Sequence, residues 1–530
     1  MAETNDSTRK TTLDKDLDKL ISVEEATTFL ARGLVAPGVA LFFMAFVAVA
    51  VAIFTAGDPG AVAIVAAAAI GAYMALNIGA NDVANNVAPA VGARALTMGG
   101  ALVLAAIFET AGALVAGGDV VQTISRGIID PAVVADPAVF VRAMMAAVFA
   151  SAVWINLATA IGAPVSTTHS VVGGVMGAGI TAAGFAAVDW GVMSGIAASW
   201  VISPLLGGLI AAGFLAFIKS RIIYQDDKIR AARLWVPILI GIMGGAFAAY
   251  LATKGLSRLV HLSASGILVI GVGTFFLAWG LSQLLVSRQA AGMENRNQSL
   301  RKLFKLPLIV SAALLSFAHG ANDVANAVGP LAAIVQTARG GDVESAVAIP
   351  FWVMLIGAFG ISFGLLLFGP RLVRMVGEQI TKLNPMRAFC VALSAALTVI
   401  VASWFGLPVS STHIAVGAVF GVGFFREWYT ANSPRRRAYM ERKMERRRGE
   451  RLANGTVAEF DMAAEPWEED ADARNGPAGV AAEPVSGEDV IRRRLVRRAH
   501  FSTIIAAWIV TVPAAALLAG GIFMILGTLR

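Results

Sequence analysis

Long apolar stretches separated by short polar connections make up most of this chain. Many hold roughly 20 residues, the length at which an α-helix crosses the hydrocarbon core of a bilayer. None shows the alternating pattern of an outer-membrane β-barrel, and helices satisfy their own backbone groups in lipid. We therefore predict an all-α polytopic membrane protein, about 12 core spans plus one extra N-terminal span, with thirteen apolar segments near 34–55, 61–88, 97–116, 142–160, 164–184, 189–217, 235–253, 264–286, 306–335, 346–369, 386–404, 408–425 and 502–527.

Composition and charge agree with a membrane setting. The apolar fraction is 57% and the mean hydropathy is +0.72, whereas soluble domains have about 45 to 50% apolar residues. The net charge of +7 reflects basic connections such as those after Lys219, Arg296 and Pro434. Because Lys and Arg gather on cytoplasmic loops, we expect a multi-pass protein of the cytoplasmic membrane, with its N-terminus inside, its C-terminus outside and no nucleic-acid partner.

An acidic motif occurs twice within these apolar segments. It reads NIGANDVANNVAP around Asp82 and HGANDVANAVGP around Asp323, 241 positions later. An intramembrane carboxylate costs roughly 2.5 to 3.5 kcal/mol, so it normally faces a cavity and holds a cation or a proton. Glycine and proline flank each copy and favour a break in the helix that frees backbone carbonyls. Oxygen ligands of this kind suit a hard cation such as sodium, and the strongest candidates are Asp82 and Asp323, together with carbonyl oxygens of the neighbouring asparagines.

A hydroxyl motif also occurs twice, as PVSTTH from Pro164 and PVSSTH from Pro408, 244 positions apart. A proline early in a helix followed by hydroxyl residues lets first-turn N–H groups and hydroxyls converge on an anion. The alternative is a proline kink whose freed carbonyls are satisfied by Ser and Thr. Neither motif contains Lys or Arg, so co-bound cations have to offset the charge of an anion. The candidate anion ligands are Ser166, Thr167, Thr168, Ser410, Ser411 and Thr412.

The two motifs share nearly one offset and lie seven segments apart, which predicts an inverted-topology repeat. Trp200 and Trp508 stand in similar contexts but are 308 positions apart, so the second half contains an insertion. A charged stretch poor in apolar residues accounts for it, and such a composition predicts disorder. The predicted organisation is a cytoplasmic tail 1–33, an extra span 34–55, a first repeat 61–217, linking spans 218–305, a second repeat 306–425, a disordered cytoplasmic loop 426–500 and a final span 501–530.

These motifs, together with IFETAG from Ile107 and AWIVTVP near the end of the chain, resemble the inorganic phosphate transporter (PiT) family of sodium- or proton-coupled phosphate symporters. The resemblance covers about 61–425 and 502–527, and the spelling GANDVAN is similar to the sodium-coupled members. It implies helical hairpins, a homodimer and phosphate contact by the six hydroxyl residues named above. It also implies sodium ligation by Asp82, Asn85, Asp323 and Asn326, and we take Asn81 and Asn322 as possible coupling residues. The extra first span, the position of the charged loop and the lack of a second-half glutamate near Ala392 depart from the family pattern.

Several other polar residues have two interpretations. Glu109 lies in an apolar segment, so it either serves a cation path or proton relay or makes a structural hydrogen bond. His169 and His413 end the hydroxyl motifs and either titrate or bridge helices. His319 has no counterpart in the first copy, where Ile78 stands, and we assign it asymmetric tuning at most.

We therefore predict a secondary active symporter that imports inorganic phosphate with sodium as co-substrate, and with protons as the alternative coupling ion. A sulfate symporter of the same architecture is the nearest alternative, because sulfate shares the tetrahedral shape. An anion channel is the alternative from another class, but a channel more naturally places a symmetric pore at an oligomer axis. No enzyme is expected, since the chain has neither a Walker loop nor an HExxH zinc motif, and no cofactor is expected.

Overall fold

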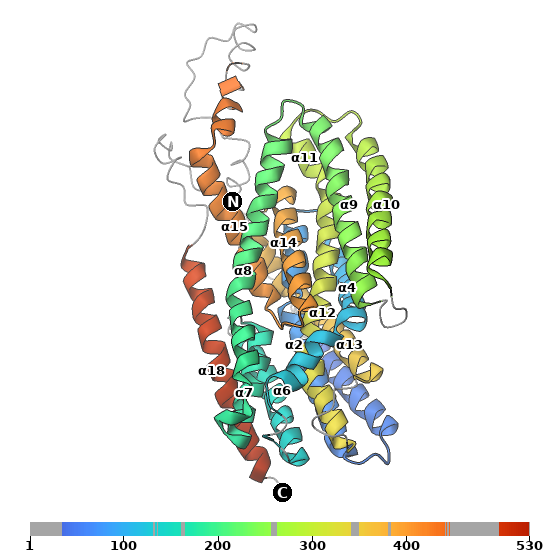
Figure 1. Ribbon diagram of the computed structural model, residues 1–530, viewed down its shortest axis with the longest axis vertical. Coiled ribbons are helices and arrows are strands. Elements are labelled where there is room, and N and C mark those ends of the chain that lie inside the picture. The colour runs from blue at the N-terminus through green and yellow to red at the C-terminus, as the bar shows by residue number, and fades with distance from the viewer. Residues whose placement is uncertain are drawn as a thin grey trace, which may run out of the picture.

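The described part of the protein is a bundle of long helices (Figure 1). A computed structural model describes residues 34–130, 133–134, 136–160, 165–255, 262–340, 349–379, 383–439, 441–442, 445 and 498–528. Eleven of the described helices are long and apolar enough to cross a membrane, which confirms the predicted polytopic all-α class. Of the thirteen predicted segments, those at 164–184 and 408–425 are not among these eleven.

The first half begins with an unlabelled helix, Leu34–Phe54, and reaches the end of α8. Its elements are α2 (Ala61–Asn81), α3 (Ala84–Gly92), α4 (Met98–Ala116), α5 (Gly118–Gln122), the π-helix η1 (Thr123–Gly127), α6 (Pro137–Ala160), α7 (Thr167–Ala183), the short 3-10 helix η2 (Phe185–Ala187) and α8 (Trp190–Ile218).

The linking region and the second half follow. They contain the π-helix η3 (Lys219–Ile223), α9 (Lys228–Lys254), α10 (Ala264–Ala290), α11 (Asn297–Leu303), α12 (Lys305–Ala338), α13 (Phe351–Gln379), α14 (Pro385–Trp404), α15 (Ser411–Asn432) and α18 (Arg498–Thr528). The predicted tail 1–33 and residues 446–497 of the predicted loop lie outside the described residues, and α15 continues as a helix beyond position 426.

The N-termini of α7 and α15 meet inside the molecule. The Thr168 hydroxyl of α7 donates to the Val409 carbonyl just before α15, at 3.1 Å. From this meeting point α7 runs toward one end of the bundle and α15 toward the other (Figure 1). Each of these helices also packs against the helix that precedes it, α6 and α14 respectively, so each pair forms a helical hairpin.

Helices of the two halves pack against each other in a reciprocal pattern. In the outer layer α7 packs against α18 while α15 packs against α8, and in the inner layer α2 packs against α13 while α12 packs against α4. Each partnership therefore joins an element of one half to an element of the other. An inverted repeat would produce this exchange of partners, and the inverted repeat itself stays a prediction.

Glycines set two of these helix crossings. A Cβ atom on Gly79 would lie 1.9 Å from the Ile361 carbonyl oxygen, and one on Gly320 would lie 2.2 Å from the Glu109 carbonyl oxygen. Small residues let the backbones of membrane helices approach closely, as lipid supplies no hydrophobic driving force between helices. The glycine that precedes each acidic motif is therefore a packing requirement of the crossing.

The predicted break in the helix is present in the first acidic motif only. There α2 ends at Asn81 and α3 begins at Ala84, so Asp82 lies between them. The break predicted for the second copy is wrong, because α12 runs unbroken through Gly320 and Pro330. In an apolar 18-residue stretch of α12, 89% of the residues are buried inside the protein. Neighbouring helices tolerate a proline in a membrane helix when they surround it in this way.

The extra N-terminal helix Leu34–Phe54 packs along the outside of α13. The Phe43 and Phe363 rings lie 5.1 Å apart, and those of Phe54 and Trp352 lie 6.1 Å apart. Most of its other large side chains are exposed, as expected of a helix that faces lipid.

We expect Gly320→Ala to destabilise the protein, because the added Cβ would collide with the backbone of α4 and force the crossing apart. Overpacking typically costs about 1 to 3 kcal/mol, and a backbone collision lies at the upper end. The matched control is Gly280→Ala on α10, whose Cβ would meet nothing within 4 Å. Thermal unfolding of the detergent-purified variants measures the effect, and equal midpoints for both would contradict this account of the crossing.

Candidate functional site

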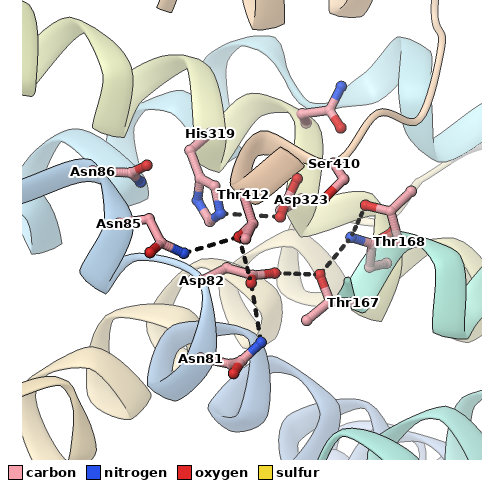
Figure 2. Close-up of polar contacts among 12 residues, drawn as sticks. Asn81, Asp82, Asn85, Asn86, Thr167, Thr168, His319, Asp323, Ser410 and Thr412 are labelled. Atoms are coloured by element: carbon pink, nitrogen blue, oxygen red, sulfur yellow. Dashed lines mark hydrogen bonds and ion pairs between the residues drawn. The ribbon is translucent and has the colours of Figure 1, made fainter. Parts of the chain in front are cut away.

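Both copies of both motifs come together at the centre of the bundle (Figure 2). The first acidic motif lies at the junction of α2 and α3, and the second lies on α12. The hydroxyl motifs form the N-termini of α7 and α15. All thirteen residues predicted to bind ions or to couple them belong to this one polar cluster, and all but two are buried; Asn85 and Thr412 are partly buried.

Asp82 is hydrogen-bonded to both hydroxyl motifs. Its Oδ2 accepts from the Thr167 hydroxyl at 2.6 Å, and its Oδ1 accepts from the Thr412 hydroxyl at 3.0 Å. The side-chain amides of Asn81 and Asn85 extend this network: Asn81 donates to the same Oδ1 at 3.1 Å, and Asn85 donates to the Thr412 oxygen at 2.9 Å (Figure 2). The carboxylate thus joins helix N-termini that come from opposite halves of the chain.

Asp323 is connected to Glu109 through His319. The Nδ1 atom of His319 lies 2.8 Å from the Glu109 Oε2, and its Nε2 lies 3.0 Å from the Asp323 Oδ2, one helical turn away on α12. The Asn86 amide donates to the other Glu109 oxygen at 2.8 Å. A carboxylate, an imidazole and a second carboxylate therefore form a continuous buried chain.

Three buried oxygen atoms near Asp82 have no hydrogen-bond partner among the residues that the structure describes. They are both carboxylate oxygens of Asp323 and the amide oxygen of Asn326. The contact between Asp323 and His319 has an ion-pair distance but not the geometry of a hydrogen bond. Buried acceptors without donors are costly. Ligand atoms of Asp82, His319 and Asp323 all lie within 4.8 Å of one another, so this region can hold a cation.

Asn81 and Asn322 hold the hairpin turns. Asn81 donates to the Val165 carbonyl at 3.2 Å, and Asn322 donates to the Leu407 carbonyl at 3.1 Å. Asn322 also accepts from the Val409 N–H at 3.2 Å. In each half, the asparagine before the aspartate therefore fixes the segment that leads into the hydroxyl helix.

The hydroxyl residues differ in what they contact. Ser166 and Ser410 are N-cap residues, whose oxygens accept from the backbone N–H of His169 and His413. Thr168 accepts from the Asn326 amide at 3.1 Å. The Ser411 hydroxyl is buried and has no hydrogen-bond partner among the described residues. The first N–H groups of both helices lack intrahelical partners, and helix N-termini of this kind can bind anions.

His169 and His413 bridge the two hydroxyl helices. Their ring centroids are 4.6 Å apart, and the His169 ring lies 3.8 Å from that of Trp200 on α8. The Trp200 indole N–H donates to the Pro408 carbonyl at 3.1 Å. These contacts favour the interpretation that the two histidines bridge helices.

Sequence reasoning missed two residues of the cluster. His319 lies between Glu109 and Asp323 and is more than an asymmetric variation on the first copy. Asn86 orients Glu109. Only the spacing of His319, four residues before Asp323, could have indicated that the two side chains share one helix face.

Comparison with known proteins identifies the family of this chain. Residues 78–519 match the phosphate transporter family. A protein of Helicobacter pylori (strain ATCC 700392 / 26695), named "Putative phosphate permease", is 44% identical over 97% of this chain and 99% of its own length. A protein of Pyrococcus abyssi with a name of the same kind is 37% identical over 67% of this chain and 87% of its own.

A solved structure has the same fold. It is named "The sodium-dependent phosphate transporter", has a TM-score of 0.73 and 31% identity, and covers 88% of this chain and 100% of its own. The family match extends across both acidic motifs and both hydroxyl motifs. This chain therefore belongs to the phosphate transporter family.

Proposed function

We propose that this protein is a secondary active symporter that imports inorganic phosphate together with sodium. The observation that carries the proposal is the Asp82 carboxylate, which accepts hydrogen bonds from Thr167 of one half and Thr412 of the other. A residue suited to a cation thus touches both motifs suited to an oxyanion. The names of the relatives and of the similar solved structure support phosphate as substrate and sodium as co-substrate.

The cation part of the proposal rests on electrostatics. Oxygens of Asp82 and Asp323 lie within 4.8 Å of each other and are buried. Two ionised carboxylates at that separation repel by roughly 3 to 4 kcal/mol at an effective dielectric of about 20. Sodium near these carboxylates, with Asn85 and Asn326 as further oxygen ligands, removes the repulsion. The unpartnered oxygens of Asp323 and Asn326 are the atoms best placed to bind it.

The phosphate part rests on the hydroxyl helices. Two helix N-termini with hydroxyl side chains converge beside the carboxylates, and their dipoles favour an anion. Neither Lys nor Arg is among the described residues that make the contacts of the cluster. A phosphate beside buried carboxylates would be strongly repelled unless cations bind with it. Cation binding therefore has to accompany phosphate binding, which is the physical basis of coupled transport.

Transport requires that only some loading states change conformation. The fully loaded site is close to charge-balanced, because the cations offset both the buried carboxylates and the phosphate, whereas a site that holds phosphate without cations exposes uncompensated negative charge to the low dielectric of the membrane. We infer that the two hairpins move relative to the helices that face them when the site is fully loaded. The end of the molecule with the basic connections, at the top of Figure 1, then faces the cytoplasm.

Proton coupling is the second candidate, and one observation favours it. The chain Glu109–His319–Asp323 gives a proton a continuous path of short contacts to the cation ligands. Sodium remains our first choice, because the unpartnered oxygens suit a metal ion and the similar solved structure is named as sodium-dependent.

We expect Asp82→Asn and Asp323→Asn, made separately, to insert normally and to lower sodium-driven phosphate uptake at least 100-fold, because each removes a charge that the cation needs. Asp189→Asn is the matched control, since Asp189 caps α8 in an exposed position and asparagine caps equally well. Uptake of labelled phosphate into proteoliposomes measures the effect. Near-normal uptake by either site variant would contradict the proposed cation site.

Substitution of Ser410 and of Ser411 should distinguish a residue that caps the helix from one that contacts the substrate. We expect Ser410→Ala to lower the stability of the protein by about 1 kcal/mol through loss of the N-cap. Ser411→Ala should leave the thermal midpoint unchanged but raise the KM for phosphate several-fold. Ser394→Ala, which removes a buried hydroxyl bonded within α14, is the control. An unchanged KM for Ser411→Ala would remove this hydroxyl from the phosphate site.

The coupling ion and the substrate can be determined together. Proteoliposomes are given a sodium gradient or a pH gradient separately, with sulfate added as a competitor in excess. We expect labelled phosphate to accumulate with the sodium gradient, and sulfate to compete weakly. Accumulation driven by the pH gradient alone would identify protons rather than sodium as the coupling ion. Dominant competition by sulfate would identify the protein as a sulfate symporter.

A further inference from the structure

The turn of the α14–α15 hairpin is held by residues of two other elements, α9 and η1. The ammonium group of Lys254, the last residue of α9, donates to the carbonyl of Trp404, the last residue of α14, at 3.2 Å. The Thr123 hydroxyl of η1 donates to the Gly406 carbonyl at 2.7 Å. The last carbonyls of a helix have no partner within it. Residues outside the hairpin therefore supply donors to its turn.

An ion pair fixes the Lys254 side chain in this position. Lys254 also donates to the Asp119 carboxylate of α5, and its Nζ lies 5.7 Å from the centre of the Trp404 ring. One ammonium group thus joins α9, α5 and the end of α14. The side chains of Lys254 and Asp119 are 22% and 46% exposed. Ion pairs in such positions change an equilibrium constant by about two- to fivefold, so this pair can break and re-form readily.

The same turn contacts the central cluster on its other side. Asn322 donates to the Ser403 hydroxyl at 2.9 Å and to the Leu407 carbonyl at 3.1 Å. Asn322 directly precedes Asp323, one of the proposed cation ligands. The turn therefore connects the Lys254–Asp119 ion pair to the cation ligands through only a few residues.

The ion pair lies at the end of α9 opposite the basic connections. α9 begins at Lys228, close to the basic stretch after Lys219, and its 27 residues are long enough to cross a bilayer. α14 runs in the same direction, because its first residues lie beside α11 and η3 at the basic end. In the proposed function the basic end faces the cytoplasm, so the turn of the hairpin faces the exterior.

We propose that the Lys254–Asp119 ion pair is a latch that holds the α14–α15 turn closed over the central cluster on the external side, and that the turn opens to admit ions when the pair breaks. This inference rests on the proposed function, which places phosphate and sodium behind the turn. A fully buried ion pair would hold the turn permanently, because breaking it leaves an uncompensated buried charge. Here both partners are partly exposed, so each can be solvated when the turn opens.

A purely structural role for Lys254 makes a different prediction. The Lys254 charge near the C-terminus of α14 would then only stabilise the helix through its dipole. Loss of the Asp119 charge would leave that contact in place, because Asp119 is not needed for donation to the Trp404 carbonyl. A latch, in contrast, requires both charges.

The chain is suited to a cysteine-labelling test, because Cys390 is its only cysteine and is buried. Ser403→Cys places a second thiol behind the turn, at a position that is 3% exposed. Intact cells that express the full-length protein are treated with a charged, membrane-impermeant methanethiosulfonate in buffer without sodium or phosphate. Mass spectrometry of the purified protein gives the labelling rate, and protein without Ser403→Cys gives the background.

We expect Ser403→Cys to be labelled about two- to fivefold faster when combined with Lys254→Met or with Asp119→Asn, because the closed turn loses its ion pair. Lys254→Arg keeps a charged donor and should leave the rate unchanged. Arg296→Met is the matched control, because it breaks an exposed ion pair with Glu294 elsewhere in the chain. Asp119→Asn carries the test if Lys254→Met does not fold. Equal labelling rates in all backgrounds, or equal increases for Lys254→Arg and Lys254→Met, would overturn the proposal.

Failure of the latch and failure of the proposed function give different results. Labelling is measured without the transported ions, so it tests the latch alone, whereas absence of phosphate uptake by wild-type proteoliposomes would refute the proposed function. The KM for external phosphate should fall about two- to fivefold with Lys254→Met, because a larger fraction of the protein is open to the ion. Faster labelling with an unchanged KM would show that the turn does not control access, and would also overturn the proposal.

Discussion

The hydrogen bonds from Thr167 and Thr412 to Asp82 are the interaction on which the rest of the structure depends. A buried carboxylate is tolerated in an apolar bundle only when donors or cations surround it. Here the donors come from the first turns of two helices that belong to opposite halves of the chain. The same contact therefore stabilises the charge, fixes where the two hairpins meet and places a carboxylate suited to a cation beside groups suited to an oxyanion. Movement of either hairpin would change the surroundings of the carboxylate, and this is how the proposed function links ion binding to conformation.

Close helix packing makes this contact possible. The crossings at Gly79 and Gly320 bring the inner helices to within backbone contact, which leaves the acidic motifs facing each other across the centre. The two motif copies are not equivalent, however. Asp82 lies at a break between α2 and α3 and is surrounded by donors, whereas Asp323 lies on the continuous α12 and contacts His319. In the proposed function, the unpartnered oxygens of the second copy offer coordination positions to the cation, while Asp82 adds the charge that the cation needs and connects it to the hairpins.

Much of the site was predictable from sequence, because polar residues are so costly within lipid that they indicate function by position alone. That cost identifies Asp82 and Asp323, while an early proline followed by hydroxyl residues indicates the other two motifs, and the structure brings all four together. The continuity of α12 was not predictable, because it depends on how completely neighbouring helices bury it rather than on Gly320 and Pro330 themselves. The link between Glu109 and His319 joins residues 210 positions apart, and no local pattern encodes such a contact. The capping role of Ser410 could not be predicted from the sequence, because the same motif is also compatible with direct contact between the Ser410 hydroxyl and an anion.

The most direct test of the central claim is phosphate binding to the purified protein as a function of sodium, measured by titration calorimetry for wild type and Asp82→Asn. Linkage requires that if sodium tightens phosphate binding by some factor, phosphate tightens sodium binding by the same factor. The account predicts that sodium lowers the Kd for phosphate at least tenfold in wild type and that Asp82→Asn abolishes this dependence. The same phosphate Kd for wild type with and without sodium would contradict it.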